Sequence, residues 1–182
     1  VVKNVDNVVP ESRVATVVRW KQILVGKLVR TQGRVFELLA ALHRGEGAAE
    51  AEALLRDEFG HREALPEGAA KIERLIALLD RPIRVCGMVR NQGEPGGGPF
   101  WVHTLGGVSP QIVEASEVDE GQLSIMRTAT HFNPVDLVCG LRNWRGEPFT
   151  LDAFADHSAV FLSEKSHEGR PLMALERPGL WN

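Results

Sequence analysis

Apolar side chains recur every three or four positions through the first 80 residues, which is the period of an α-helix. Ser12 is placed to cap the first periodic segment. The pattern then predicts either one long helix or two, with a break near Gly26 or Gly33. The periodic positions are Val14, Val17, Val18, Leu24, Val25, Leu28, Val35, Phe36, Leu38, Leu39 and Leu42.

The same spacing resumes twice more and predicts helices at residues 48–59 and 67–79. Gly60 ends the first of them and Pro82 the second, because glycine favours a helix terminus and proline cannot continue a helix. Residues 12–80 are therefore expected to form one helical block.

Strand-like runs make up most of the rest, after a short strand at residues 1–9 that breaks at Asp6. Residues 93–99 cannot continue a strand, because proline lacks a backbone donor and glycine is too free. Residues 132–141 fit either a buried strand or a short helix. The other predicted strands cover residues 83–89, 100–102, 110–118, 159–164 and 171–176, the last two joined by a turn at residues 167–169.

Helices grouped first and strands grouped later predict a mixed α/β fold, with a mixed sheet and helices in a single domain over residues 1–182. The hydrophobic fraction of 43% is enough for a substantial core at this length. The chain starts at Val1 and ends in the apolar sequence Gly179-Leu180-Trp181 before Asn182. We therefore expect a fragment of a longer catalytic domain.

Charge and composition argue against two classes of partner. A net charge of -3 and the absence of tyrosine give no footprint for a nucleic-acid backbone. No apolar run approaches the roughly 20 residues that a membrane span needs. Two cysteines, Cys86 and Cys139, lie in apolar runs, and such sparse usage fits a reducing compartment. The predicted location is the cytoplasm.

Carboxylates at strand ends are the first candidates for chemistry. Mg²⁺ prefers one or two carboxylates and leaves room for substrate phosphates, although such acids more often serve as caps or solvated turn residues. Glu114 stands out, because it directly follows apolar Ile112 and Val113 where a strand would open onto a cleft. The candidate acids are Asp6, Glu114, Glu117, Asp119 and Asp136.

Residues 93–98 could bring backbone amides close to a phosphate or sugar, but GEPGGG composition is more often a mobile hairpin. The loop lacks the ending of a phosphate-binding Walker motif. His103 and His131 with the two cysteines lack the paired spacing of a zinc site, and no G-x-S-x-G motif supports a serine triad. The basic residues that could hold phosphate are Lys3, Arg90, Arg127 and Lys165.

Five long motifs together resemble the C-terminal part of a bacterial family, the domain of unknown function DUF4301. They are KNVDNVVP, RPIRVCGMVRNQGEPGGGPFWV, SPQIVEASEVD, THFNPVDLVCG and LERPGLWN. The motifs span nearly the whole chain. This resemblance implies no activity.

Five shorter fragments, in the same order along the chain, are similar to motifs of UDP-sugar pyrophosphorylases. They are Asn4-Val5-Asp6-Asn7, Val85-Cys86-Gly87, the run from Ile112 to Val118, Thr130-His131-Phe132 and Ala174-Leu175-Glu176-Arg177. The similarity implies the C-terminal half of a GT-A-like nucleotidyltransferase fold, with residues 12–80 as a helical insertion. In these enzymes a sugar 1-phosphate oxygen attacks the α-phosphorus of a nucleoside triphosphate, and pyrophosphate leaves. Such chemistry needs positioning and charge neutralisation more than a covalent nucleophile.

The resemblance also implies roles for individual residues. Asp6 would hold Mg²⁺ as the catalytic metal ligand, Gly87 would present backbone to the sugar, and Glu114 would accept hydrogen bonds from sugar hydroxyls. Lys165 is expected to contact a phosphate. The asparagine that reads the sugar precedes the His-Phe pair in the pyrophosphorylases, whereas here Asn133 follows it. Asp6, Gly87 and Glu114 are predicted to line one cleft at the carboxyl ends of neighbouring strands.

Two alternatives belong to other functional classes. The chain lacks the glycine-rich nucleotide-binding loop of the pyrophosphorylases, so alone it is expected to be inactive. A catalytically silent module could instead use residues 93–98 and the strands of residues 81–119 to bind a carbohydrate or a protein. A third hypothesis is a structural interaction domain that self-associates through the helices of residues 12–80.

Overall fold

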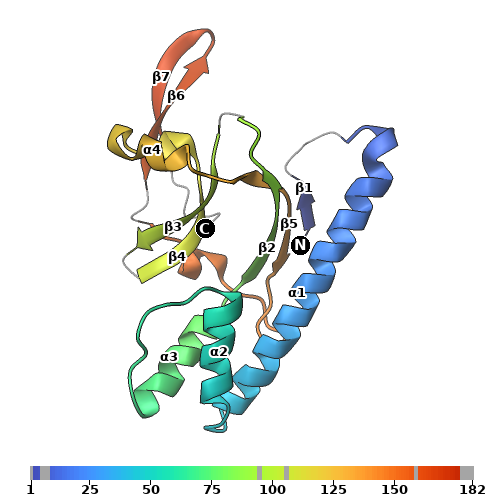
Figure 1. Ribbon diagram of the computed structural model, residues 1–182, viewed down its shortest axis with the longest axis vertical. Helices are drawn as coiled ribbons and strands as arrows, with labels where there is room; N and C mark the ends of the chain where they lie inside the picture. The colour runs from blue at the N-terminus through green and yellow to red at the C-terminus, as the bar shows by residue number, and fades with distance from the viewer. Residues whose placement is uncertain (1, 5–8, 94–95, 105–106, 158–159, 177–182) are drawn as a thin grey trace. The chain divides into compact units, whose positions relative to one another are not determined.

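A computed structural model describes residues 2–4, 9–93, 96–104, 107–157 and 160–176 (Figure 1). It confirms a mixed α/β architecture, but the strands form small antiparallel sheets where one mixed sheet was predicted. The strands of the described part form sheets with the orders β1-β5-β2, β3-β4 and β6-β7.

The chain divides into two compact units. The first unit comprises Val1–Met88, Val102–Pro110 and Pro134–Phe149, and the second comprises Val89–Trp101, Gln111–Asn133 and Thr150–Asn182. Gly87 therefore belongs to the first unit, whereas Glu114 and Lys165 belong to the second.

The first helix, α1 (Val14–Leu42), is continuous, so neither Gly26 nor Gly33 breaks it. Both glycines lie on its exposed side, where nothing would meet an added Cβ. Ser12 was predicted to be the N-cap of this helix, and this is wrong. A 3₁₀ turn precedes the helix, and Arg13 takes the cap position. The other elements of the helical block are η1 (Glu11–Arg13), α2 (Ala48–Glu58) and α3 (Ala69–Leu79). In the described part of the chain, no helix has the length and apolar character to cross a membrane.

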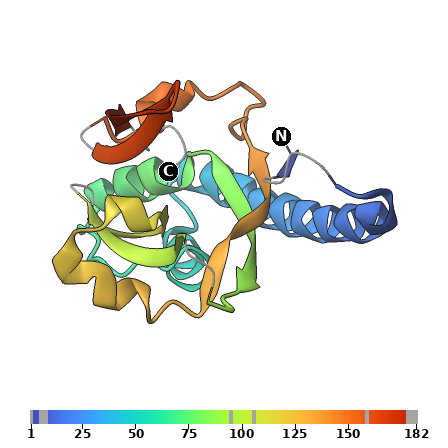
Figure 2. The same ribbon diagram turned by 90° about the horizontal axis from the view of Figure 1, so that it is seen from above.

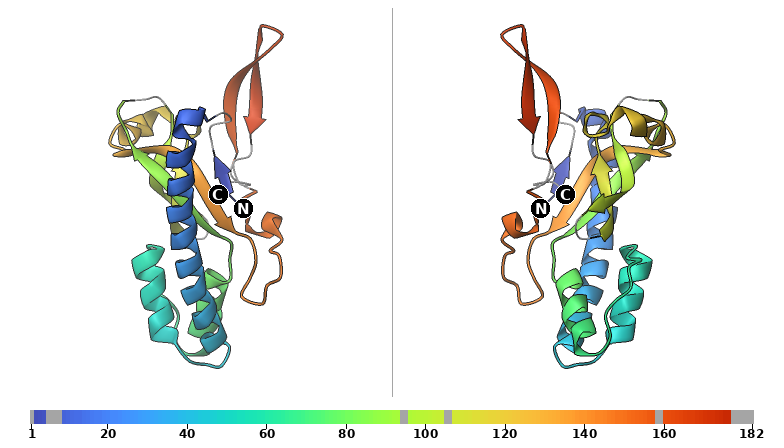
Figure 3. Two further views of the ribbon diagram at one scale, coloured as in Figure 1. Left: turned by 90° about the vertical axis from the view of Figure 1, so that its right-hand side faces the viewer. Right: turned by 90° about the vertical axis from the view of Figure 1, so that its left-hand side faces the viewer.

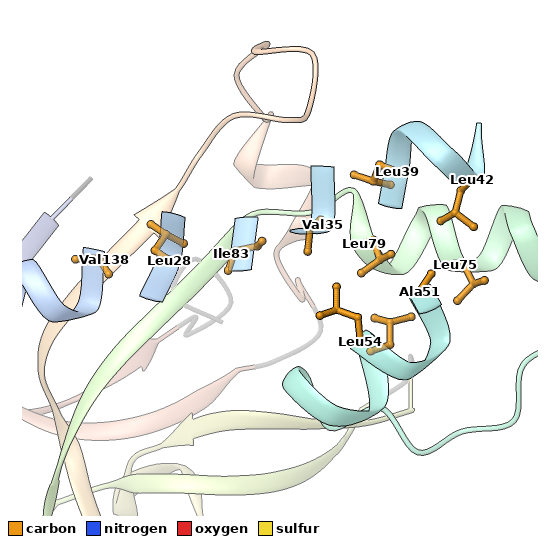
Figure 4. Packing of buried hydrophobic residues seen from close by; sticks show 11 residues of the cluster. Leu28, Val35, Leu39, Leu42, Ala51, Leu54, Leu75, Leu79, Ile83 and Val138 are labelled. Carbon is orange, nitrogen blue, oxygen red and sulfur yellow. The ribbon is translucent and has the colours of Figure 1, made fainter. Parts of the chain in front are cut away.

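One hydrophobic core lies between α1, α2 and α3 in the first unit (Figure 4). The side chains that the helical period placed on one face of α1 enter it, and Leu39 is fully buried there. Ile83 and Val138 extend the core onto the adjoining strands. The buried members are Leu28, Val35, Leu39, Leu42, Ala51, Leu54, Leu55, Leu75, Leu79, Ile83 and Val138.

The sheet beside α1 consists, in order, of β1 (Val2–Asn4), β5 (His131–Gly140) and β2 (Ile83–Arg90). The segment 132–141, for which the sequence left two alternatives, is thus a strand. β1 runs antiparallel to β5 and places Asn4 opposite Asp136. Within the first unit, α1 crosses one face of this sheet (Figure 2). The sheet and the helices therefore share one core.

The strands β3 (Gly98–Thr104) and β4 (Gly107–Val113) form a two-stranded sheet. Two predictions fail here. Gly98 and Pro99 belong to a strand, although the sequence assigned them to the interruption. The strand expected over residues 110–118 begins at Gly107 and ends at Val113, because Glu114 starts a 3₁₀ turn, η2 (Ala115–Glu117). The short helical elements after it are η3 (Glu120–Gln122) and α4 (Leu123–Met126).

The predicted C-terminal hairpin is confirmed as β6 (Phe161–His167) and β7 (Arg170–Glu176), which form a twisted ribbon (Figure 3). A 3₁₀ turn, η4 (Leu151–Phe154), precedes it. Glu168 and Gly169 both have positive φ, 50° and 76°, as a two-residue type I′ turn requires. The turn pairs His167 with Arg170 and so fixes the register of the whole hairpin.

Asp80 ends α3 in the first unit among charged and aromatic groups. Its Oδ1 is buried and has no hydrogen-bond partner among the described residues. Burial raises the pKa of the Asp80 carboxyl, while the charges of His43 and Arg145 oppose the rise and that of Glu147 adds to it. His43 and Arg145 both contact Trp144, the former as a stacked ring with centroids 5.2 Å apart. The Asp80 carboxyl therefore binds a proton more tightly in the folded chain than in the unfolded chain.

This raised pKa predicts a pH dependence of stability. A group whose pKa is higher in the folded state contributes stability below its unfolded pKa and loses it as the pH rises through the folded value. The free energy of unfolding should therefore fall relative to that of Asp80→Asn as the pH rises from below the ordinary value of 3.8 towards neutrality. Urea unfolding of both proteins across this range measures the difference, and parallel curves would contradict the assignment.

Candidate functional site

The structure locates three of the five predicted site residues fully. Asp6 lies outside the described residues, and Asn133 lies in β5 but its side chain is also outside them. Glu114 and Lys165 fall in the second unit, and Gly87 falls in the first. The predicted meeting of Asp6, Gly87 and Glu114 in one cleft stays a prediction.

Glu114 is held by its neighbours in sequence. It is the N-cap of η2 and forms a reciprocal capping box with Glu117. The Glu114 backbone N–H donates to Glu117 Oε2 at 2.6 Å, and the Glu114 side chain faces the Glu117 backbone N–H. The local geometry thus gives Glu114 a structural role as a cap, with its carboxylate near a second acid.

One face of the β6–β7 hairpin carries Ser163, Lys165 and Glu176, because alternate residues of a strand share a face. Lys165 Nζ lies 2.7 Å from Glu176 Oε1, and the Ser163 hydroxyl donates to the same oxygen. Hydrogen bonds from Lys165 and then Ser163 lower the pKa of Glu176. Glu176 is therefore held as a carboxylate.

The turn η2 packs against β6 within the second unit. Burial raises the pKa of Glu117, the backbone N–H of Glu114 opposes this, and the nearby charges of Glu114 and Glu176 add to it. Three carboxyl groups, one hydroxyl and one ammonium group are thus gathered from distant parts of the sequence. We call Glu114, Glu117, Ser163, Lys165 and Glu176 the second-unit polar cluster.

This cluster has the chemistry to bind a polar, hydroxylated ligand. Carboxylates accept hydrogen bonds from hydroxyl groups, and an ammonium group pairs with phosphate as a point charge. The Lys165 side chain is 54% exposed, so a ligand can reach it without unfolding the hairpin. Glu176 competes with any anion for Lys165, which predicts that binding rearranges this ion pair.

Gly87 lies where β2 approaches α1 and β5. A Cβ at this position would meet Leu24 Cδ1 at 3.2 Å and the Asp136 backbone oxygen at 3.5 Å. Asp136 is 5% exposed, and Lys21 Nζ from α1 lies 3.5 Å from its Oδ1. Lys21 and Asp136 therefore form an ion pair, although Asp136 Oδ1 has no hydrogen bond within the described residues. Gly87 thus lies next to the buried Asp136, which pairs with Asn4 at the end of β1.

The glycine-rich segment is anchored where it begins, in the second unit. The Asn91 backbone N–H donates to the Thr130 carbonyl at 3.1 Å, and Asn91 Oδ1 accepts from the Gly93 N–H at 2.8 Å. At the other end, a Cβ on Gly98 would lie 2.7 Å from the His131 carbonyl oxygen. Close backbone packing therefore explains the glycine at position 98 without a ligand.

Comparison with known proteins gives one finding. A family model, the domain of unknown function DUF4301, matches residues 1–182. The chain belongs to the DUF4301 family. No curated protein and no solved structure matches it.

In its described residues, the DUF4301 chain has no group of three or more His, Cys, Asp or Glu side chains that could hold a metal ion. Asp6 is outside this search. The described acids thus give no metal centre on which a mechanistic step could be built.

Sequence reasoning missed two members of these sites. Ser163 was not among the predicted site residues, yet the hairpin places it on the same face as Glu176, to which its hydroxyl donates. The two-residue turn alone could have indicated that neighbourhood. Lys21 was read only as part of a helix, and no local signal relates it to Asp136, because packing of α1 on the sheet brings them together.

Proposed function

We propose that this DUF4301 chain is part of a sugar-nucleotidyltransferase-like protein with a GT-A-like fold. The protein would transfer a nucleotidyl group from a nucleoside triphosphate to a sugar 1-phosphate and release pyrophosphate. In this reaction a phosphate oxygen of the sugar forms a bond to the α-phosphorus while the bond to pyrophosphate breaks. The chain would contribute residues that hold the sugar phosphate.

The second-unit polar cluster is the observation that supports this proposal. Glu114 was predicted from the motif of residues 112–118 and Lys165 from its positive charge, and each belongs to this cluster through a neighbouring acid. In the proposed role, Lys165 pairs with the sugar phosphate and the carboxylates accept hydrogen bonds from sugar hydroxyls. Both contacts position the substrate rather than react with it, as this reaction requires.

Mg²⁺ and Asp6 remain part of the proposal only through the resemblance to UDP-sugar pyrophosphorylases. One or two carboxylates suffice for Mg²⁺ when substrate phosphates complete its shell. Such an ion would neutralise charge on the reacting phosphates. Because the described residues gather no such ligand set, no step is assigned to the metal.

Calorimetric titration with glucose 1-phosphate and N-acetylglucosamine 1-phosphate tests the proposal. Lys165→Met should weaken binding roughly ten- to hundredfold, as expected for the loss of a hydrogen bond to a charged group. Lys71→Met is the matched control, because Lys71 also pairs with a glutamate, Glu52, on the surface of the first unit. Equal affinities in the two variants, or no binding by the wild-type protein, would refute the assignment of Lys165.

A catalytically silent binding module is the second candidate, and the capping box favours it. Glu114 and Glu117 satisfy backbone groups of each other, so their presence needs no catalytic explanation. Pyrophosphate release by the natural protein, supplied with Mg²⁺, a nucleoside triphosphate and a sugar 1-phosphate, separates the candidates. Sugar phosphate binding that depends on Lys165 without any release would favour the silent module.

A further inference from the structure

α1 is strongly basic in a chain whose net charge is negative. Its only acidic residue is Glu37, and its five basic residues are Arg19, Lys21, Lys27, Arg30 and Arg34. Lys21 faces the sheet, where it pairs with Asp136. Of the other four, Arg19, Arg30 and Arg34 are exposed, and Lys27 is partly exposed. α2 has the opposite balance, with four acidic residues and one basic residue.

These basic residues share one face with two exposed apolar side chains. Residues three or four positions apart lie above one another on a helix, and the members of this set follow that spacing. Trp20 is 55% exposed and Ile23 is 49% exposed, so the face is not part of the core. We call this set the α1 basic stripe, and its members are Arg19, Trp20, Ile23, Lys27, Arg30 and Arg34.

A shallow groove of about 530 Å³ opens in the middle of the stripe. Leu24 and Val85 give it apolar walls, while Lys27 and Arg30 line it with positive charge. Gly26 also lines the groove, and nothing lies within 4 Å of the place where a Cβ of Gly26 would be. The groove thus suits an apolar group flanked by negative charge.

The stripe already holds one carboxylate from the same chain. Lys27 pairs with Glu58 at the end of α2. The hydrogen bond from Lys27 lowers the pKa of Glu58, and the charges of Arg30 and Arg34 add to this effect. Among the described residues, Arg19, Arg30 and Arg34 take part in no ion pair. Positive charge on the stripe therefore exceeds what the chain itself neutralises.

We propose that the α1 basic stripe docks an acidic amphipathic helix of another protein. An apolar side chain of that helix enters the groove beside Gly26, and its carboxylates pair with Arg19, Arg30 and Arg34. From Arg19 to Arg34 the stripe runs roughly 22 Å at 1.5 Å per residue, which is four turns of a partner helix. Helix-in-groove recognition uses this arrangement of apolar anchors and complementary charge.

Charge complementarity favours this occupant over two others. A second copy of the chain docking through the same face would bring like charges together, because a two-fold interface pairs a surface with itself. An anionic membrane would attract the arginines, but interfacial helices bury a broad apolar face. The stripe offers only Trp20 and Ile23 for that purpose.

The probe is a fluorescein-labelled helical peptide of about 18 residues, which is long enough to span the stripe. It carries glutamates at helical spacing around a central leucine, and a second peptide has glutamine at every glutamate position. Fluorescence anisotropy with the whole chain measures both affinities. The glutamate peptide should bind at least about tenfold more tightly than the glutamine peptide, and added salt should weaken it.

Two pairs of variants assign the site. Arg30→Glu should weaken peptide binding about tenfold or more, whereas Arg74→Glu, on the exposed side of α3, should not change it. Ile23→Ser should also weaken it, whereas Val29→Ser, 62% exposed on another side of α1, should not. All four variants are expected to fold, because each replaces an exposed side chain. Circular dichroism and thermal unfolding check this.

Three outcomes would overturn the proposal. One is equal affinity for the two peptides, and another is binding that Arg30→Glu leaves unchanged. The third uses phosphatidylcholine vesicles that contain phosphatidylserine. If the chain sediments with them in an Arg30-dependent way but binds neither peptide, the stripe is a membrane-binding surface instead.

Discussion

Leu39→Ala should lower the free energy of unfolding by roughly 2–5 kcal/mol, the range for a large aliphatic side chain removed from a well-packed core. Leu39 is fully buried in the middle of the cluster that joins α1 to α2 and α3. The change removes buried apolar surface and leaves a cavity that the surrounding helices fill only in part. Urea unfolding at neutral pH measures the loss.

Val29→Ala is the matched control for this prediction. Val29 lies on the same helix and is 62% exposed, so its truncation should change the free energy of unfolding by less than about 0.5 kcal/mol. Similar losses in both variants would mean that α1 is not fixed by one buried face. That result would contradict the packing of α1 described above.

The helical core could be predicted well because it depends on a local repeat. The apolar positions at a spacing of 3.6 residues on α1 become the buried face, and Leu39 and Val35 were among the periodic positions. The start of α1 was less predictable. Ser12 is a good capping residue, but the chain forms a 3₁₀ turn first and the cap position falls at Arg13. The apolar repeat predicted the helix, whereas the residue at which the helix begins depends on local backbone geometry.

The strand that was extended through Glu114 shows how two local signals compete. Apolar Ile112 and Val113 favour a strand, and nothing in their alternation ends it before Val118. Glutamates three residues apart, at positions 114 and 117, can also cap each other at the start of a helical turn. In the structure the capping interaction prevails, and the strand ends at Val113.

In the candidate sites, too, local features could be predicted from the sequence, whereas contacts made by packing could not. The sequence could nominate Lys165, and the hairpin turn could place Ser163 on its face, because a two-residue turn fixes every later pair. The approach of η2 to β6 could not be predicted, since it depends on the packing of segments that are distant in sequence. The same holds for Lys21 and Asp136, whose contact exists only after α1 covers the sheet.

Lys21→Met should lower the free energy of unfolding by roughly 2–4 kcal/mol, because it leaves Asp136 as a buried, unpaired charge. The Asp136 side chain is 7% exposed and its Oδ1 has no hydrogen bond to a described residue. The estimate lies below that for fully buried pairs because 26% of the Lys21 side chain is exposed. Urea unfolding of the wild type and Lys21→Met measures it.

A double-mutant cycle separates the ion pair from ordinary packing. Asp136→Asn should cost less than Lys21→Met, because unpaired Lys21 can extend towards solvent whereas unpaired Asp136 cannot. The double variant should regain part of the loss, since neither charge is then left alone in the interior. Additive losses would show that the 3.5 Å contact carries no coupling. In that case Asp136 would not anchor α1 to the sheet beside Gly87, and its burial opposite Asn4 would need another explanation.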